Sequence, residues 1–229
     1  MTIRSLYRPM KTPLPAIQVQ STFLNLPEEK KSRILETAIH EFAEKGYDGS
    51  SINTMVSRLG ISKGSIFQYF NNKKSLFFYV FDYAVGLVKR TLVQVKEETE
   101  NEEVFERIRK SLLAGIGFIQ KHPHIYRIYL NLQLGSDTPF RTEFIHKIRL
   151  FSGEYLSSLL RQGMERGEIS NKISLNQAVF LLDAVLDRFL LAYTVPYLSW
   201  EDKIYKAPKR TIEEWADGLT ELLRKGLQG

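Results

Sequence analysis

Residues 50–76 read SSINTMVSRLGISKGSIFQYFNNKKSL, and this stretch decides the fold because it contains two short helices separated by a tight turn. Ser50 or Ser51 can cap the first helix, which Gly60 ends after about two and a half turns. Ser62 can cap the second, in which apolar side chains recur four residues apart. Two short helices joined by such a turn are typical of a helix-turn-helix unit. The residues expected to face inward are Ile52, Met55, Val56, Leu59, Ile66 and Phe70.

A longer helix is predicted before this pair. Pro27 suits a first helical position, and Glu28 and Glu29 suit the positive end of the helix dipole. Apolar residues then recur at helical spacing until Gly46. Residues 1–26 contain three prolines and show no sustained periodicity, so we expect a flexible N-terminal arm there. Its basic residues are candidates for contact with a partner: Arg4, Arg8 and Lys11.

The rest of the chain is also predicted to be helical, because no run of alternating apolar and polar residues bounded by turns occurs in it. Asn72 can cap a long fourth helix that reaches about Glu98. The sequence therefore predicts an all-α chain of about nine helices. The later helices are expected at about residues 102–121, 123–135 and 138–167, and at starts marked by the capping pairs Ser174–Gln177 and Thr211–Glu214.

Positive charge is concentrated in the first part of the 229-residue chain. Residues 1–90 hold 13 lysines and arginines against 7 acids, whereas residues 91–229 hold 19 against 19. No acid occurs between Asp48 and Asp82, which would give a surface suited to polyanions. Charge alone favours an ordinary solvated face, so a nucleic-acid prediction must rest on the motif.

Composition disfavours several classes of protein. With 43% hydrophobic and 25% charged residues the chain has the balance of a folded globular protein. No stretch of about 18 uncharged apolar residues is present, which excludes an integral membrane protein. The absence of cysteine and of an N-terminal signal pattern disfavours export, disulfides and thiolate catalysis. We therefore expect a cytoplasmic protein.

The segments Gly46-Tyr47, Ser50-Ser51-Ile52 and Leu59 to Leu76 together resemble the DNA-binding domain of the TetR family of bacterial regulators. The resemblance covers about 50 residues and includes the Ser-Lys-Gly-Ser opening of the third helix and the lysine that opens the fourth. It implies a helix-turn-helix DNA-binding domain at residues 27–72. It also implies a larger helical domain at residues 73–229 that binds a small ligand and dimerises.

The third helix is the expected recognition helix, which must enter a major groove about 12 Å wide. Lys63 can read guanine acceptors and Gln68 can read adenine, whereas Gly64 is small enough for the backbone to approach the base edges. Specificity is therefore expected mainly from these two side chains. The predicted DNA-binding residues are Ser51, Ser62, Lys63, Gly64, Ser65, Phe67, Gln68, Tyr69 and Lys73.

Phosphate contacts are expected from Ser51, Tyr69 and Lys73, which position a protein on DNA without reading its sequence. The chain departs from the resembled family at Phe67, where a tyrosine is usual and its hydroxyl commonly binds a phosphate. We therefore expect Phe67 to be only an apolar contact or a core residue. Ile52 cannot hydrogen-bond a base, so recognition is expected to depend more on the third helix.

The last two helices are expected to form the dimer interface, as the resemblance implies. Each carries an apolar stripe, and two such helices per subunit could form an intersubunit four-helix bundle. Burial of the same stripes within one subunit is nearly as compatible with the sequence. The expected interface residues are Leu181, Val185, Arg188, Phe189, Trp215, Leu219, Leu222 and Leu223.

Aromatic residues are frequent in helices four to eight, which suggests an apolar or aromatic ligand, although such residues are more often simply core. Asp183 and Asp187 share one helix face beside Arg188. They would fix a cationic ligand or form an interface salt bridge, and we favour the interface. The expected ligand-binding residues are Tyr83, Phe118, Tyr126, Tyr129, Phe144, Phe151 and Phe180.

No catalytic triad, phosphate-binding glycine loop or paired-carboxylate pattern is found, so we expect neither an enzyme nor a cofactor. His122 and His124 flank Pro123, but no clustered acids complete a metal site. The sequence predicts a homodimeric repressor that binds a palindromic DNA operator and is released by a small-molecule effector. The alternatives are an architectural DNA-binding protein without a ligand, and a helical small-molecule-binding protein or enzyme with an incidental resemblance.

Overall fold

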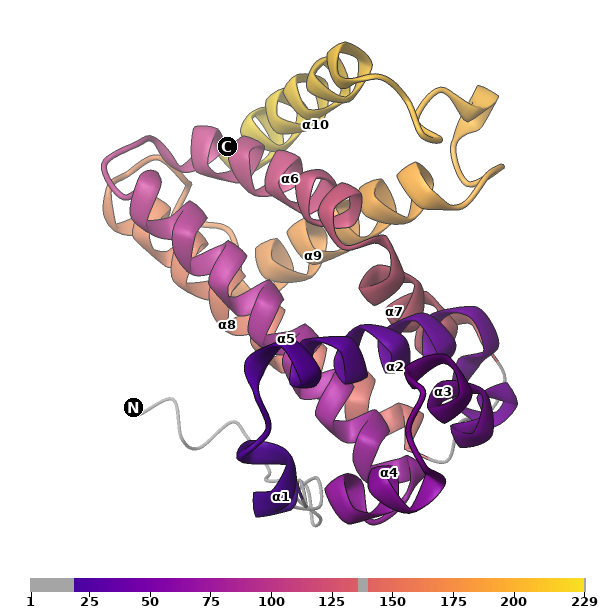
Figure 1. Cartoon of the computed structure of the whole chain (residues 1–229). Helices are drawn as coiled ribbons and strands as arrows, with labels where there is room; N and C mark the ends of the chain where they lie inside the picture. The colour runs from indigo at the N-terminus through magenta and orange to yellow at the C-terminus, as the bar shows by residue number, and fades with distance from the viewer. Residues whose placement is uncertain (1–18, 136–139, 229) are drawn as a thin grey trace. The chain divides into compact units, whose positions relative to one another are not determined.

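The computed structural model describes residues 19–135 and 140–228, and every regular element in these ranges is helical (Figure 1). The predicted all-α class is therefore confirmed. The described residues form ten α-helices and one 3-10 turn, because a short helix precedes the predicted first one. The helices are α1 (Ser21–Leu24), α2 (Glu28–Gly49), α3 (Ile52–Leu59), α4 (Lys63–Phe70), α5 (Lys73–Glu98), α6 (Val104–Lys121), α7 (Pro123–Leu134), α8 (Arg141–Glu165), α9 (Leu175–Thr194), η2 (Trp200–Asp202) and α10 (Lys209–Gln228).

The helices form two compact units that do not follow the order of the chain. Unit 1 contains the described residues up to Tyr83 together with Arg127–Glu143. Unit 2 contains Ala84–Tyr126 together with the described residues from Phe144 onward. Helices α5, α7 and α8 therefore each contribute residues to both units. The boundary between the DNA-binding and ligand-binding domains predicted at residue 72 concerns function and remains a prediction.

The prediction of a flexible arm is wrong for residues 19–26, which include helix α1. Phe23 is completely buried, and its ring centroid lies 4.6 Å from that of Phe70 and 5.2 Å from that of Tyr79. One phenylalanine in a four-residue helix leaves no periodic signal, and its partners are distant in the sequence. The arm residues Arg4, Arg8 and Lys11 lie outside the described residues.

The local signals for α2, α3 and α4 are confirmed. Gly46 has φ 64° and breaks the helical geometry of α2, and Gly60 ends α3 in the left-handed conformation with φ 66°. The hydroxyls of Ser51 and Ser62 each accept a hydrogen bond from the backbone N–H three residues later. The turn between α3 and α4 is therefore specified by its own residues.

The later helix ends agree with the sequence only in part. Asn72 caps α5 as predicted, with its Oδ1 accepting from the N–H of Ser75 at 2.8 Å. Ser174 precedes α9 without a side-chain cap, and α10 begins at Lys209, so that Thr211 lies inside it. The helix start predicted at Ser174 is therefore confirmed without its side-chain cap, whereas the start predicted at Thr211 is wrong. A matching residue spacing does not fix the side-chain geometry.

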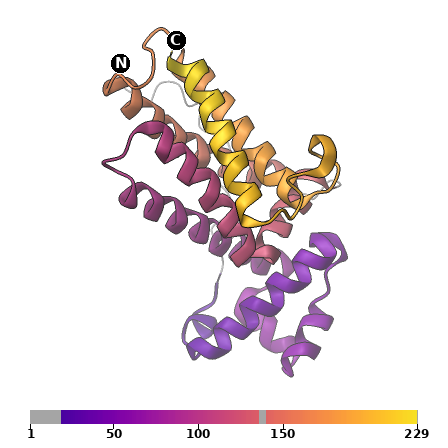
Figure 2. The same cartoon turned by 90° about the horizontal axis from the view of Figure 1, so that it is seen from above.

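Unit 2 has its hydrophobic core among α6, α9, α10 and the second half of α8, and α10 lies along α6 in both views (Figures 1 and 2). Close helix contacts require glycine. A β-carbon on Gly115 would lie 2.8 Å from Leu190 Cδ2, and one on Gly163 would lie 2.9 Å from Val104. The predicted start of the seventh helix at residue 138 lies outside the described residues, and α8 is described from Arg141.

Candidate nucleic-acid interface

Helix α4 has one buried face and one exposed face. Ile66 and Phe70, four residues apart, expose 1% and 0% of their surface, as the sequence predicted. Lys63, Gly64 and Gln68 are exposed. The side chains assigned to base reading therefore lie on the exposed face and are available to a ligand as large as DNA.

The two serines at the start of α4 have local partners. Ser62 Oγ accepts from the N–H of Ser65 at 3.1 Å, and the two hydroxyls are 2.9 Å apart. Phe67 is 37% exposed, so it is not a core residue, and the ammonium of Lys63 lies 5.9 Å from its ring centroid. The exposure of Phe67 is compatible with the predicted apolar contact to DNA and excludes the alternative that Phe67 is a core residue.

Lys73 holds the end of α2 in place. Its ammonium donates to the carbonyl oxygens of Tyr47 at 2.7 Å, Ser50 at 3.1 Å and Asp48 at 3.3 Å. It also lies 4.6 Å from the ring centroid of Tyr47. An ammonium has three hydrogens, and each has a carbonyl partner here. The structure therefore gives Lys73 a different task from the predicted phosphate contact.

Tyr69, a predicted phosphate contact, does not lie on the exposed face of α4. It is 7% exposed, and its ring centroid lies 5.9 Å from that of Phe23. The burial of α1 against α4 explains the difference. Ser51 caps α3 through its hydroxyl, with the N–H of Thr54 donating at 3.4 Å.

Glu41 is a positioning residue that the sequence analysis missed. It is 3% exposed, and its Oε1 accepts from the N–H of Ser51 at 3.1 Å. Its Oε2 pairs with Arg58 at 3.4 Å, so one carboxylate connects α2 to both ends of α3. Its burial could have been predicted from its spacing, because Glu41 falls three residues after buried Ala38 on the apolar stripe of α2.

The predicted ligand-binding residues are not gathered in one unit. Tyr83 and Tyr129 belong to unit 1, and the others belong to unit 2. Within unit 2, Phe144 is completely buried, whereas Phe180 is 77% exposed. The intermediate cases are Phe118 and Phe151, which are half-buried, and Tyr126, which is 7% exposed.

The hydrophobic core of unit 2 omits two helical segments. Residues 84–98 of α5 and 144–153 of α8 contribute none of its members, although Val95 and Phe144 are buried outside it, with 7% and 0% exposed. Residues 145–153 are half-buried on every face of the helix. Phe151 is one of them, and the ammonium of Lys89 lies 5.1 Å from its ring centroid. These two segments are the loosely packed part of unit 2.

The predicted interface residues divide into exposed and buried groups. Leu181 and Leu222 are 44% and 69% exposed, whereas Phe189 and Leu223 are 2% and 5% exposed within the subunit's own core. Those last two are therefore wrong as interface residues. Arg188 donates to the carbonyl of Leu198. The half-buried members, which pack against the core, are Val185, Trp215 and Leu219.

Asp183 and Asp187 have a partner in the same chain. Arg149 on α8 places Nη1 2.9 Å from Asp183 and Nη2 3.1 Å from Asp187, and Ser152 donates to Asp183 at 3.2 Å. This arrangement differs from both sequence-based alternatives, a cationic ligand and an interface salt bridge. The sequence could not reveal it, because Arg149 lies 34 residues from Asp183.

The described residues also bear on two other kinds of site. None of their helices is long and apolar enough to cross a membrane. No three His, Asp or Glu side chains among them gather closely enough to hold a metal ion. His122 packs against Phe118, and burial, followed by the charges of Lys121 and Arg90, lowers its pKa.

Comparison with known proteins agrees with this geometry. Residues 34–80 match the model of the family described as bacterial regulatory proteins, tetR family. The HTH-type transcriptional repressor AcnR of Corynebacterium glutamicum is 25% identical over 169 residues, 72% of this chain and 81% of that protein. The fatty acid metabolism regulator protein of Bacillus subtilis is 25% identical over 170 residues, 72% and 84%. The match to the uncharacterized regulator YerO of Bacillus subtilis, 25% identical over 142 residues, spans 60% of this chain and about half (49%) of that protein.

Solved structures show the same fold. A TetR family transcriptional regulator from Chloroflexus aurantiacus has a TM-score of 0.69 at 26% identity, covering 91% of this chain and 98% of that one. FadR of Bacillus subtilis, solved with stearoyl-CoA, has a TM-score of 0.65 at 18% identity, covering 86% and 98%. AibR, solved with isovaleryl coenzyme A and operator DNA, has a TM-score of 0.59 at 20% identity, covering 84% and 97%. The last two likenesses concern the fold alone.

Proposed function

Because the chain belongs to the TetR family of transcriptional regulators, we propose that it is a homodimeric repressor that leaves a palindromic operator when an effector binds unit 2. It is a DNA-binding regulator and not an enzyme. The single observation that carries the proposal is the exposed face of α4, which lies within the matched residues 34–80.

Base reading is proposed for two side chains on that face. Lys63 suits the acceptors of guanine, and Gln68 suits adenine. Gly64, also exposed, allows the backbone of α4 to approach the base edges. Ser51 remains a candidate phosphate contact at the start of α3, whereas Lys73 is not proposed for this role because its donors have carbonyl partners.

A twofold dimer is proposed because a palindromic operator presents two half-sites about 34 to 36 Å apart. Exposed apolar side chains on the last two long helices support it. Phe180 and Leu181 on α9 and Leu222 on α10 are 77%, 44% and 69% exposed. Side chains of this size are favoured at an isologous interface, where the same patch contacts its copy.

An effector with a long apolar part is proposed for the loosely packed part of unit 2. Its apolar side chains, such as Val88 on α5 and Phe151 on α8, are half-buried and outside the core, so they have surface left to cover. Two proteins of the same fold were solved with coenzyme A thioesters, stearoyl-CoA and isovaleryl coenzyme A. Acyl thioesters are therefore the class of compound to test first.

Helix α5 is proposed as the element that couples the two events. It runs without interruption from Lys73 to Glu98, and residues up to Tyr83 belong to unit 1 while those from Ala84 belong to unit 2. An effector that favours a second position of α5 would change the separation of the two recognition helices in a dimer. Typical allosteric coupling of about 1 to 3 kcal/mol is sufficient for such a population shift.

The test is binding of the purified protein to DNA upstream of its own gene, at several salt concentrations, with a scrambled duplex as control. We expect specific binding to exceed non-specific binding about a thousandfold or more. Gln68→Ala should cost about 1 to 3 kcal/mol at one base position, because one base-specific contact is lost. Asn53→Ala is the matched control, since Asn53 is an exposed amide on α3 outside the predicted DNA-binding set.

Equal, steeply salt-dependent binding to both duplexes would contradict the proposal, since it would indicate phosphate contacts without base reading. Release of the specific complex by palmitoyl-CoA, but not by an equal concentration of coenzyme A, is the expected effector response. Operator affinity that no acyl thioester changes would contradict the effector class.

A further inference from the structure

Unit 2 contains a buried arginine without an acidic partner. Arg107, in the first turn of α6, is 3% exposed, yet no carboxylate of the described residues lies within ion-pair distance of it. Its Nη1 donates to Oε1 of Gln162 at 2.8 Å, and its Nε has no hydrogen-bond partner in the described part of the chain. A guanidinium carries five N–H donors, and the buried Nε–H is the one left without a partner among the described residues.

The nearest acids do not neutralise this charge directly. Glu168 accepts the backbone N–H of Val104 at 2.7 Å, so its carboxylate caps the start of α6. Burial is the largest cause that lowers the pKa of Arg107, and Arg166 lowers it further, while Glu168 and Glu100 act in the opposite direction from a distance. Buried charges are normally paired, because desolvating an ion costs several kcal/mol. Replacement of such a charge by an apolar residue of similar size is often neutral or stabilising.

The groups around Arg107 are polar and contain no acid. Ser111, one helical turn further along α6, lies with its hydroxyl 2.8 Å from that of Tyr155 on α8. Gln162, two turns after Tyr155, supplies an amide. These four residues form the Arg107 cluster, which carries one positive charge. Ser111 donates its hydroxyl hydrogen to the carbonyl of Arg107 at 2.8 Å, so the unused donor among the described atoms of the cluster is the Nε–H of the guanidinium. The positive end of the α6 dipole adds to its potential, so the cluster is complementary to an anion.

We propose that the Arg107 cluster binds the anionic group of the effector, a carboxylate or a phosphate, while the apolar part lies against the loosely packed segments of α5 and α8. The inference rests on the proposed function, because it concerns the effector of unit 2. It adds a charged end to the apolar ligand predicted from the sequence. A guanidinium suits both anions, since each presents two oxygens to its fork of donors.

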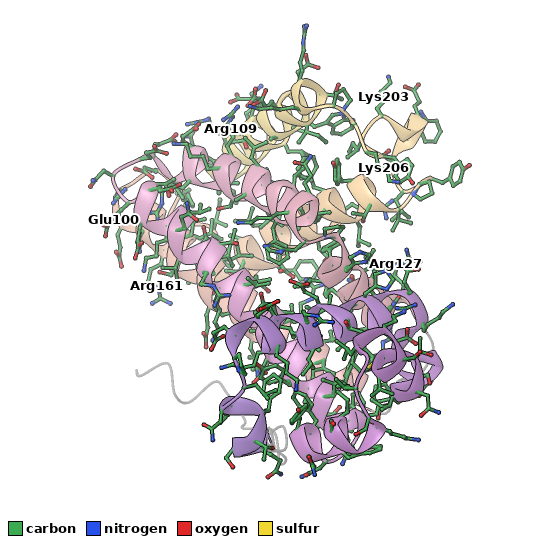
Figure 3. The ribbon with its side chains drawn as sticks, in the orientation of Figure 1. Glu100, Arg109, Arg127, Arg161, Lys203 and Lys206 are labelled. Carbon is green, nitrogen blue, oxygen red and sulfur yellow. The ribbon has the colours of Figure 1, made fainter. Side chains whose placement is uncertain are left out.

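The test compares Arg107→Met with Arg109→Met in the full-length protein. Arg109 is on the same helix beside α10 (Figure 3), and its guanidinium already pairs with Asp217 and Glu106. Both variants lose one positive charge, but only the first loses the buried cation. Affinities for palmitate, palmitoyl-CoA and coenzyme A are measured by calorimetry, and melting temperatures are measured without ligand.

We expect Arg107→Met to weaken binding of the preferred ligand about 10- to 100-fold, while Arg109→Met leaves it unchanged. Preference for palmitate would identify a carboxylate, and preference for palmitoyl-CoA over palmitate would identify the phosphates. The unliganded Arg107→Met protein should melt at the same or a higher temperature than the wild type, because an uncompensated buried charge is removed.

Three results would overturn the inference. One is unchanged ligand affinity in Arg107→Met, and another is a much lower melting temperature of that variant, which would make Arg107 a support of the fold. The third is a wild-type protein that binds none of the three probes. Operator binding without ligand is measured in parallel, so failure of the regulator proposal appears there and remains distinguishable from failure of this one.

Discussion

The two ends of α5 are packed very differently, although they belong to one continuous helix. In unit 1, Leu76, Phe77 and Val80 are at most 2% exposed. In unit 2, Val88 is half-buried and Val93 is 50% exposed, and Val95 is the one buried apolar residue of this end of α5. The first end is therefore fixed by burial, whereas the second end can be displaced at a low cost in free energy.

This difference in packing suits a helix that couples effector binding in unit 2 to operator binding by unit 1. A tightly packed end cannot move alone, because close-packed side chains transmit a displacement to their neighbours. A loosely packed end leaves room for a ligand to select among positions that differ by only a few kcal/mol. Coupling then requires only that the effector prefers one of these positions.

The largest effect is expected from Phe77→Ala at the fixed end. The ring of Phe77 contacts those of Phe42 at 4.8 Å, Tyr47 at 5.1 Å and Phe140 at 5.7 Å, measured between centroids. Its truncation should lower the free energy of unfolding by about 3 to 5 kcal/mol, because a cavity replaces a buried ring. Urea denaturation followed by circular dichroism measures this loss.

Val88→Ala is the matched truncation at the other end of the same helix. Val88 is half-buried and makes no part of the core, so we expect a loss below about 1 kcal/mol. Comparable losses for the two variants would contradict the difference in packing between the ends of α5.

A loss smaller than that of Phe77→Ala is expected from Lys73→Met. The carbonyls of Tyr47 and Ser50 would lose a charged donor, which should cost about 1.5 to 3 kcal/mol of folding free energy. Because the ammonium points into the protein, the salt dependence of operator binding should keep its slope. Denaturation and operator titrations at several salt concentrations measure the two effects.

Lys74→Met provides the control for charge. Lys74 is exposed and lies 5.6 Å and 5.4 Å from the ring centroids of Phe78 and Phe140, so its removal should cost about 1 kcal/mol or less. If Lys73→Met reduced the salt dependence of operator binding by about one in slope, Lys73 would contact a phosphate as the sequence predicted.

Local signals were sufficient to predict the helix-turn-helix unit. Ser51, Gly60, Ser62 and Asn72 each act within three residues of their own position, as a cap or a left-handed stop. Such interactions depend on sequence neighbours alone, so the residues that form them can be read directly. The exposed face of α4 follows from the same short-range spacing.

Long-range contacts account for the features of the structure that the sequence analysis predicted wrongly or missed. The burial of Phe23 depends on α4 and α5, and the carbonyl partners of Lys73 lie 23 to 26 residues away. Arg149 pairs with acids more than 30 residues further along the chain, and Arg107 with an amide 55 residues away. No periodicity or cap encodes these pairings, because they arise only when helices distant in the sequence pack together.

The smallest effect is expected from the ion pair between Arg149 and Asp183, which connects the loosely packed half of α8 to α9. Both side chains are about one-third exposed, so solvent screens the pair. A double-mutant cycle with Arg149→Met and Asp183→Asn should give a coupling of about 0.5 to 1 kcal/mol in the free energy of unfolding, and less at high salt. Weak coupling is what a displaceable segment requires. A coupling above about 2 kcal/mol would mean that this half of α8 is held firmly, and the proposed space for an effector would then have to be sought elsewhere in unit 2.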